Sequence, residues 1–118
     1  MKKNLIILFL IIVAVIGIYY FASGVKPVAQ NQNQTMISVD AKRWQFTPDI
    51  IRIKKGQIVK IIINNTDTIH GINLPDFNAA GDNSIEFTAD KTGEFTFFCK
   101  NFCGEGHKNM TGKIIVTE

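Results

Sequence analysis

The sequence predicts an all-β domain, a Greek-key β-sandwich, preceded by an N-terminal transmembrane helix. Three observations support this fold class. Short runs of β-branched and aromatic residues recur through the last two thirds of the chain, glycine-containing turns separate these runs, and one long apolar segment lies near the N-terminus. The 118 residues suffice for one compact domain and no more.

The N-terminal segment has the length and composition of a membrane span. Residues 5–21 contain no charged or strongly polar side chain, and Lys2 and Lys3 precede them. The run is longer than the usual apolar part of a cleavable signal peptide, although the small residues at 22–24 resemble a cleavage site. We expect residues 1–22 to be an uncleaved anchor that crosses the cell membrane once. Because flanking lysines stay in the cytoplasm, the C-terminal domain is expected on the extracytoplasmic side.

The rest of the chain divides into a linker and a working domain. Residues 23–35, SGVKPVAQNQNQT, have few large apolar side chains, so we expect them to form a flexible linker. Residues 36–118 form the expected domain, which is small enough for a bound metal to help its stability. No helix is expected within this domain. Its expected strands are residues 36–42, 49–55, 57–65, 70–74, 83–90, 93–99 and 112–118.

The charge of the chain excludes one class of partner. The formal net charge is +3, and the part beyond Lys2 and Lys3 is nearly balanced. The sequence has no basic cluster with interleaved aromatic residues of the kind that binds single-stranded nucleic acid. We therefore expect no nucleic-acid partner, and we expect protein docking to be mainly apolar with a shallow salt dependence.

The residues with distinctive chemistry are gathered in the stretch FFCKNFCGEGHKNMTG. Cys99, Cys103, His107 and Met110 have the spacing C-x3-C-x3-H-x2-M on a loop between two expected strands. Thiolate, imidazole and thioether are ligands of a soft, redox-active metal, and copper suits this set best. The remaining histidine, His70, follows a long apolar strand whose end is expected beside the loop. The site would then use every Cys and every His of the chain.

Other interpretations of Cys99 and Cys103 compete with copper. A disulfide would close a very small loop and remove little chain entropy, although it would form readily in oxidised, metal-free protein. A thiol–disulfide oxidoreductase usually has C-x-x-C at the start of a helix, which is a different spacing and context. A zinc site with two cysteines and two histidines leaves Met110 without a role.

Two kinds of copper site fit the ligands. A mononuclear blue-copper centre needs one cysteine, two histidines and a weak axial methionine, and it leaves Cys99 surplus. Two copper ions that share two bridging thiolates would use Cys99 as well, with each ion completed by one histidine and one weaker ligand.

Residues 36–118 resemble the CuA-type cupredoxin domain of cytochrome c oxidase subunit II, which is also found in nitrous oxide reductase. The segment FCKNFCGEGHKNMTGKIIV matches the family's C-x3-C-G-x2-H-x2-M loop at every ligand. The segment RWQFTPDIIRIKKGQIVKIIINNTDTIHGINLP resembles the strand pair that leads to the first histidine. The resemblance implies the cupredoxin fold and a binuclear copper centre.

The resemblance also implies the ligands of each of the two copper ions. Both ions would share the thiolates of Cys99 and Cys103. One ion would be completed by His70 and Met110, and the other by His107 and the backbone carbonyl of Asn101.

Two features depart from the family pattern. Many oxidase subunits have an acidic residue at the position of Asn101, where its side chain helps to bind a metal at the interface with the catalytic subunit. Asn101 still offers its backbone carbonyl as a copper ligand, but its side chain lacks the carboxylate that helps to bind the interface metal. The chain also has one membrane segment rather than two, like the short subunits of ba-type oxidases.

No general base, nucleophile or open metal position is evident, so the chain is not expected to be a catalyst by itself. The resemblance implies one-electron transfer as subunit II of a terminal cytochrome c oxidase. The donor would be a cytochrome c or a small copper protein, and the acceptor a haem-containing catalytic subunit. A free-standing, membrane-anchored electron carrier and a copper-delivery protein are the alternatives.

Aromatic residues surround the expected ligands. Phe97, Phe98 and Phe102 are expected to belong to the core and to exclude water from the metal. Trp44 resembles the aromatic region through which electrons enter oxidase subunits. As the only Trp of a small domain, however, its ordinary role would be packing.

Overall fold

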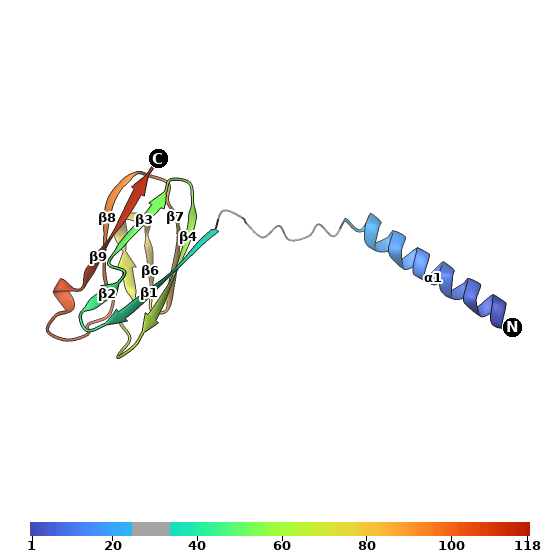
Figure 1. Cartoon of the computed structure of the whole chain (residues 1–118), viewed down its shortest axis with the longest axis horizontal. Coiled ribbons are helices and arrows are strands. Elements are labelled where there is room, and N and C mark those ends of the chain that lie inside the picture. The colour runs from blue at the N-terminus through green and yellow to red at the C-terminus, as the bar shows by residue number, and fades with distance from the viewer. Residues whose placement is uncertain (25–33) are drawn as a thin grey trace. The chain divides into compact units, whose positions relative to one another are not determined.

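A computed structural model describes residues 1–24 and 34–118 (Figure 1). The chain divides into two compact units, Met1–Gln32 and Asn33–Glu118. The linker expected over residues 23–35 falls mainly on residues 25–33, which lie outside the described part of the chain. The first strand begins at Gln34, two residues before the predicted start of the domain.

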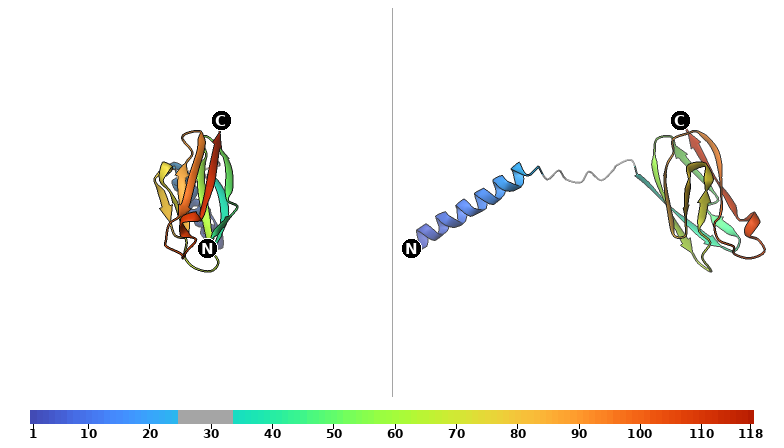
Figure 2. Two further views of the ribbon diagram at one scale, coloured as in Figure 1. Left: turned by 90° about the vertical axis from the view of Figure 1, so that its left-hand side faces the viewer. Right: turned by 180° about the vertical axis from the view of Figure 1, so that it is seen from behind.

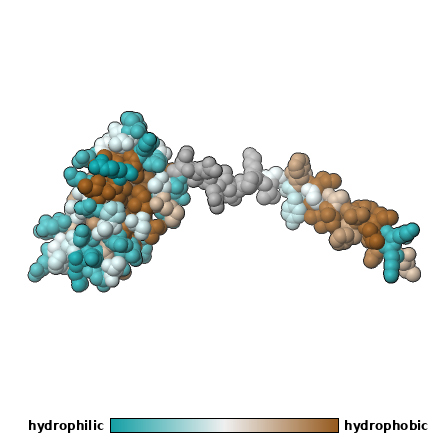
Figure 3. Space-filling view, viewed as in Figure 1, coloured by the Kyte–Doolittle hydropathy of each residue, from teal (hydrophilic) through white to brown (hydrophobic). Residues whose placement is uncertain are grey.

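The N-terminal unit contains the helix α1 (Lys2–Ala22). Its 21 residues span about 31 Å at the helical rise of 1.5 Å per residue, close to the ~30 Å thickness of the bilayer hydrocarbon core. Apolar side chains surround the helix and are exposed (Figure 3). The helix is therefore long and apolar enough to cross a membrane, as the sequence predicts.

Residues 34–118 form two mixed sheets, shown in Figure 1 and Figure 2. The four-stranded sheet has the order β2 (Gln45–Thr47), β1 (Gln34–Lys42), β4 (Ile58–Asn65) and β7 (Ser84–Thr88). The five-stranded sheet has the order β3 (Ile50–Lys54), β9 (Thr111–Thr117), β8 (Gly93–Cys99), β5 (Ile72–Leu74) and β6 (Ala79–Gly81). Two single-turn 3-10 helices, η1 (Pro75–Phe77) and η2 (His107–Asn109), complete the domain. The predicted β-sandwich is confirmed.

Alternation of apolar side chains explains why these segments form a sandwich. In β3 and β7 every second residue is buried, which places one face of each strand against the opposite sheet. Phe46 of β2 and Phe97 of β8 meet in the core with ring centroids 5.1 Å apart. The largest fully buried side chains include Phe46, Phe97, Ile61, Ile72, Leu74, Met110, Ile114 and His70.

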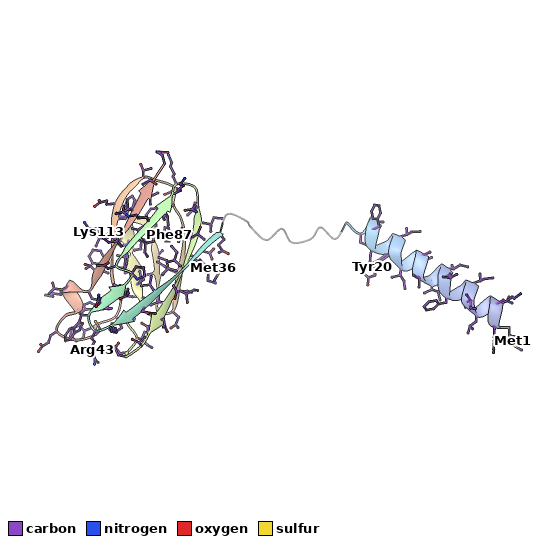
Figure 4. The ribbon with its side chains drawn as sticks, viewed as in Figure 1. Met1, Tyr20, Met36, Arg43, Phe87 and Lys113 are labelled. Carbon is purple, nitrogen blue, oxygen red and sulfur yellow. The ribbon has the colours of Figure 1, made fainter. Side chains whose placement is uncertain are left out.

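The register of β1 gives the domain two distinct ends. β1 runs parallel to β4, with Gln34 opposite Ile58 and Ala41 opposite Asn65. The chain thus enters the sandwich at the end that holds the turn from β3 to β4, which we call the entry pole. The opposite end, the distal pole, holds the turn after β1 and residues 66–71 and 100–110. Figure 4 shows Met36 and Arg43 at opposite ends of β1.

Candidate metal centre

The end of the β5–β8–β9 ladder brings the expected ligands to the distal pole. Ile72, two residues after His70, is paired with Cys99. One step beyond the last β8–β9 pair, the Cys99 N–H donates to the Met110 carbonyl at 3.0 Å. The Asn101 N–H donates to the His70 carbonyl at 2.9 Å. These backbone bonds fix the backbone positions from which the candidate ligand side chains extend.

Two thiols lie at the centre of the site, each with an imidazole beside it. The Sγ atoms of Cys99 and Cys103 are 3.3 Å apart and unbonded, since a disulfide requires about 2.05 Å. His70 Nδ1 lies 3.7 Å from Cys99 Sγ, and His107 Nδ1 lies 3.7 Å from Cys103 Sγ. The ligand atoms of His70, Cys99 and Cys103 all fall within 4.8 Å of one another.

Two weaker donors lie next to the same sulfurs. Met110 Sδ is 3.9 Å from Cys103 Sγ, and the Asn101 carbonyl oxygen accepts the Cys99 thiol at 3.1 Å. All six residues proposed from the sequence are thus gathered at the distal pole.

The site is largely closed to water. Met110 and His70 are fully buried, and Cys99 and Cys103 are each 5% exposed. Burial, together with the neighbouring Cys103 thiol, raises the pKa of Cys99 to about 12. In the metal-free protein Cys99 is therefore a neutral thiol at pH 7, and it would have to lose its proton in order to bind a metal.

The donor set fits copper better than zinc. Two thiols, two imidazoles, one thioether and one carbonyl exceed the four ligands of a structural zinc site. A buried thioether beside a thiol suits a soft ion such as copper. Two sulfurs 3.3 Å apart, flanked by an imidazole on each side, are suitably placed to share metal ions between them.

Asp67 contacts the His70 ring at Nε2, the ring nitrogen other than the one that lies near the Cys99 thiol. Its Oδ1 lies 2.6 Å from His70 Nε2, and its Oδ2 accepts the backbone N–H of Arg43 at 2.8 Å. These two hydrogen bonds, that from Arg43 first, lower the pKa of Asp67 to about 2. Asp67 is therefore ionised at neutral pH beside a buried imidazole. The sequence alone does not mark this residue as functional, although its place three positions before His70 is visible in the stretch DTIH.

The Asn101 side chain ties the two ligand loops together. Its Nδ2 donates to the His70 carbonyl at 3.1 Å and to Asp82 Oδ1 at 2.9 Å. Hydrogen bonds from Asn101 and Lys100 lower the pKa of Asp82. Gly71 permits this close approach, because a Cβ there would lie 2.7 Å from the Gly81 carbonyl oxygen and its φ is +67°.

Arg43 and Trp44 hold the loop from the side of β1. Arg43 Nε and Trp44 Nε1 both donate to the carbonyl of Cys103 at 3.3 Å. The indole lies so close to the loop that a Cβ on Gly106 would be 2.3 Å from Trp44 Cγ. Trp44 is therefore a packing residue and also a direct hydrogen-bond neighbour of a proposed ligand. Only the packing role was derived from composition, because a contact across 59 residues leaves no local pattern.

The prediction that three phenylalanines belong to the core is right for Phe97 and wrong for Phe98 and Phe102. Phe97 is fully buried, whereas Phe98 is 42% and Phe102 is 83% exposed. Strand alternation turns Phe98 outward from β8, and Phe102 lies on the ligand loop beyond the end of that strand. The Phe102 ring lies 5.6 Å from the His107 ring, between centroids. Because Phe102 is exposed, the loop of the candidate ligands presents an apolar side chain to the solvent.

Comparisons with known proteins agree with this geometry. The chain matches the model of the cupredoxin-like domain over residues 9–116. It is 29% identical to cytochrome c oxidase subunit 2 of Thermus thermophilus over 97 residues, which cover 77% of this chain and 72% of that protein. A second subunit 2 sequence from that species is matched over 58% of its length. Nitrous-oxide reductase of Cupriavidus necator is 29% identical over 99 residues, which are 75% of this chain and 15% of that enzyme.

Solved structures show the same fold. A chain of a heme-copper terminal oxidase dimer has a TM-score of 0.61 at 21% identity and covers 98% of both chains. The periplasmic domain of cytochrome oxidase subunit II (CoxB) of Bradyrhizobium japonicum has a TM-score of 0.63 at 22% identity, covering 70% of this chain and 83% of that one. The helix α1 and the similarity to subunit 2 fit a membrane-anchored protein. The chain belongs to the cupredoxin-like domain family, and its sequence is homologous to cytochrome c oxidase subunit II.

Proposed function

We propose that this protein transfers single electrons through a binuclear copper centre of the CuA type, as subunit II of a terminal cytochrome c oxidase. The observation that supports the centre most directly is the pair of buried thiols, 3.3 Å apart, with an imidazole 3.7 Å from each. A mononuclear blue-copper site would use both histidines but leave the Cys99 thiol without a role. The proposed ligands are His70, Cys99, Asn101, Cys103, His107 and Met110.

A bound copper pair would supply a one-electron redox couple whose charge is shared between two ions. The residues of the chain would keep the geometry of that couple constant. The backbone bonds from Cys99 to Met110 and from Asn101 to His70 tie the ligand positions to the β8–β9 ladder and to each other. Full burial of His70 and Met110 excludes water from the ligands. A rigid, dry site of this kind needs little rearrangement when its charge changes.

The electron donor, a cytochrome c or a small copper protein, would dock at the distal pole. Three apolar side chains are exposed there: Phe102 at 83%, Ile69 at 56% and Trp44 at 44%. Two of them belong to the loops that hold His70 and His107, so a partner on this surface would lie close to the proposed metal. The acceptor would be a haem-containing catalytic subunit, which the similarity to subunit 2 supports.

The orientation in the membrane follows from the charges at the N-terminus. Lys2 and Lys3 precede the apolar helix and no acidic residue accompanies them. By the positive-inside rule they would remain in the cytoplasm, so the copper domain would lie on the extracytoplasmic side. Attaching reporter enzymes after Glu118 that are active only inside or only outside the cytoplasm would test this orientation.

The decisive experiment is a copper count on the full-length chain in detergent. We expect two copper ions per chain and an electron spin resonance spectrum in which one spin is shared by two copper nuclei. Cys99→Ser should remove this shared spectrum and leave at most one copper. Ser38→Ala, an exposed change on β1 far from the ligands, is the control and should retain both ions. One copper with an ordinary blue spectrum in the unmodified chain would contradict the binuclear centre.

The copper-delivery alternative makes a different prediction about release. A delivery protein must give up its ion readily, whereas four of the proposed ligand side chains are 5% exposed or less. We expect slow release of copper to a chelator at neutral pH; rapid and complete release would favour delivery.

Extraction in mild detergent tests the partner of the chain, and it should recover a haem-containing subunit together with the chain. Recovery of the chain alone would favour a free-standing electron carrier.

A further inference from the structure

The two ring nitrogens of His70 have different neighbours. Nδ1 lies 3.7 Å from Cys99 Sγ, on the side of the thiols, and Nε2 lies 2.6 Å from Asp67 Oδ1. The ring is fully buried, so water cannot take the place of either neighbour. Its orientation is therefore decided by protein groups alone.

The identity of these neighbours determines where the ring hydrogen lies. A neutral imidazole has one N–H donor and one acceptor nitrogen, and an ionised carboxylate can only accept. A hydrogen bond between Asp67 and Nε2 therefore requires the hydrogen on Nε2. Nδ1 is left with a free lone pair that points toward the thiols, as a metal ligand requires.

Asp67 is itself held in one position. Its Oδ2 accepts the Arg43 N–H and its Oδ1 the Thr68 N–H, each at 2.8 Å. Arg43 is fixed in turn by its Nε, which donates to the carbonyl of Cys103 at 3.3 Å. A continuous chain of hydrogen bonds thus runs from the loop of Cys103 through Arg43 and Asp67 to His70.

We propose that Asp67 is a positioning residue that fixes the tautomer and orientation of His70, and that Arg43 holds Asp67 in register with the loop of Cys103. The inference rests on the proposed role of His70 as a ligand. It adds a specific cause for that role, since the carboxylate prepares the ring before copper arrives. Asp67 does not touch the metal position itself.

The first test uses the copper-free, reduced, full-length chain in detergent, labelled with 15N on histidine. We expect the unmodified protein to show a single His70 tautomer, with the hydrogen on Nε2. Asp67→Ala should produce a mixture of tautomers. Asp67→Asn should retain the Nε2–H form, because its amide oxygen still accepts that hydrogen. This arm is independent of how many copper ions the protein binds, so its outcome is separate from that of the copper count.

The second test uses copper itself. Loss of a supporting hydrogen bond to a metal-binding histidine typically lowers metal affinity about 10- to 100-fold. We expect a loss of that size in Asp67→Ala and recovery of most of it in Asp67→Asn. The reduction potential should rise in both variants, because the negative carboxylate favours the more positive, oxidised site. If Asp67 had only a structural role, Asp67→Asn would restore the copper affinity and the reduction potential together, instead of restoring the affinity while the potential stays raised.

The matched control is Asp40→Asn. Asp40 lies on β1, where its Oδ1 accepts a hydrogen bond from Asn64 Nδ2 at 3.0 Å. This change removes the same charge, and we expect no change in the tautomer, affinity or potential. The proposal is overturned if Asp67→Ala keeps a single Nε2–H tautomer, or if Asp40→Asn alters the potential as much as Asp67→Asn does. A backbone amide spectrum of each variant will confirm that it is folded.

Discussion

Gly106 shows how tightly the ligand loop is packed at the level of single residues. The loop passes so close to Trp44 that a Cβ at this position would lie 2.9 Å from Trp44 Cβ and 2.3 Å from its Cγ. These atoms lie at the base of the indole side chain, which cannot swing away as the end of a flexible chain would. The loop and the aromatic residue therefore constrain each other.

Replacing Gly106 with alanine should destabilise the domain. Overpacking of this kind typically costs about 1–3 kcal/mol of the free energy of unfolding. Urea unfolding followed by circular dichroism of the reduced, copper-free chain will measure it. Adding the same change to Trp44→Ala is the control, because removal of the indole should abolish most of the cost. An equal cost in both backgrounds would show that the contact with Trp44 is not the cause.

Protonation of Cys99 should make copper uptake depend on pH. With its pKa raised to about 12 by burial and by the Cys103 thiol, Cys99 is protonated throughout the physiological range. If Cys99 is a ligand, as proposed, copper displaces this proton, so the apparent affinity should rise as the pH rises and fall as the pH falls. Isothermal titration in buffers with different ionisation enthalpies will count the protons released. Uptake without proton release at pH 7 would show that Cys99 is already a thiolate or is not a ligand.

Some residues of the site can be identified from the sequence alone, and others cannot. The six proposed ligands could be named because five lie within twelve positions of one another and the chain has only two histidines. Asp67 and Arg43 could not, because a carboxylate or a guanidinium is ordinary on a surface. Their importance comes from contacts that only the fold creates, such as that between Arg43 and the Cys103 carbonyl.

Strand β8 illustrates the same limit at the level of elements. Its range, Gly93–Cys99, is the predicted one, because a run of aromatic and β-branched residues between glycine and the ligand loop marks it clearly. The three-residue strands β2 and β6 were not predicted, since three residues are too few to show an alternating pattern. Pairing with β1 and β5 defines them instead.

Two adjacent phenylalanines of β8 allow a matched test of strand orientation. Phe97→Ala should cost about 3–5 kcal/mol of stability, because its fully buried ring packs edge-on against Phe46. Phe98→Ala on the opposite face should cost much less, since that side chain is 42% exposed. Denaturant midpoints of the two variants will measure the difference. Equal losses would contradict the assigned faces of the strand.

The whole domain is electrically balanced. Residues 34–118 contain ten Lys and Arg and ten Asp and Glu, and every acidic residue of the chain lies within this range. No long-range field of one sign is available to attract a charged partner. We therefore expect recognition of the proposed donor to depend mainly on local apolar contact, and Phe102 is the most exposed large apolar side chain at the distal pole.

Electron transfer from a donor protein should reflect this balance. We expect the second-order rate constant, measured by stopped flow, to change little between ionic strengths of about 0.01 and 0.15 M. Phe102→Ala should lower it about tenfold, equivalent to losing ~1.4 kcal/mol of docking free energy. Phe98→Ala, exposed on the outer sheet face, is the control. A steep salt dependence, or equal effects of the two variants, would argue against apolar docking at the distal pole.

The parallel pairing of β1 with β4 has a consequence for how such a protein can evolve. Eight paired residues, Gln34 to Ala41, separate the point of entry into the sandwich from the proposed metal loops, a distance of about 26 Å at 3.3 Å per residue. Changes at the start of β1 should therefore leave the proposed ligands and the side chains proposed to meet a donor in place. Selection could alter the entry pole of the sandwich without redesigning the pole proposed to exchange electrons.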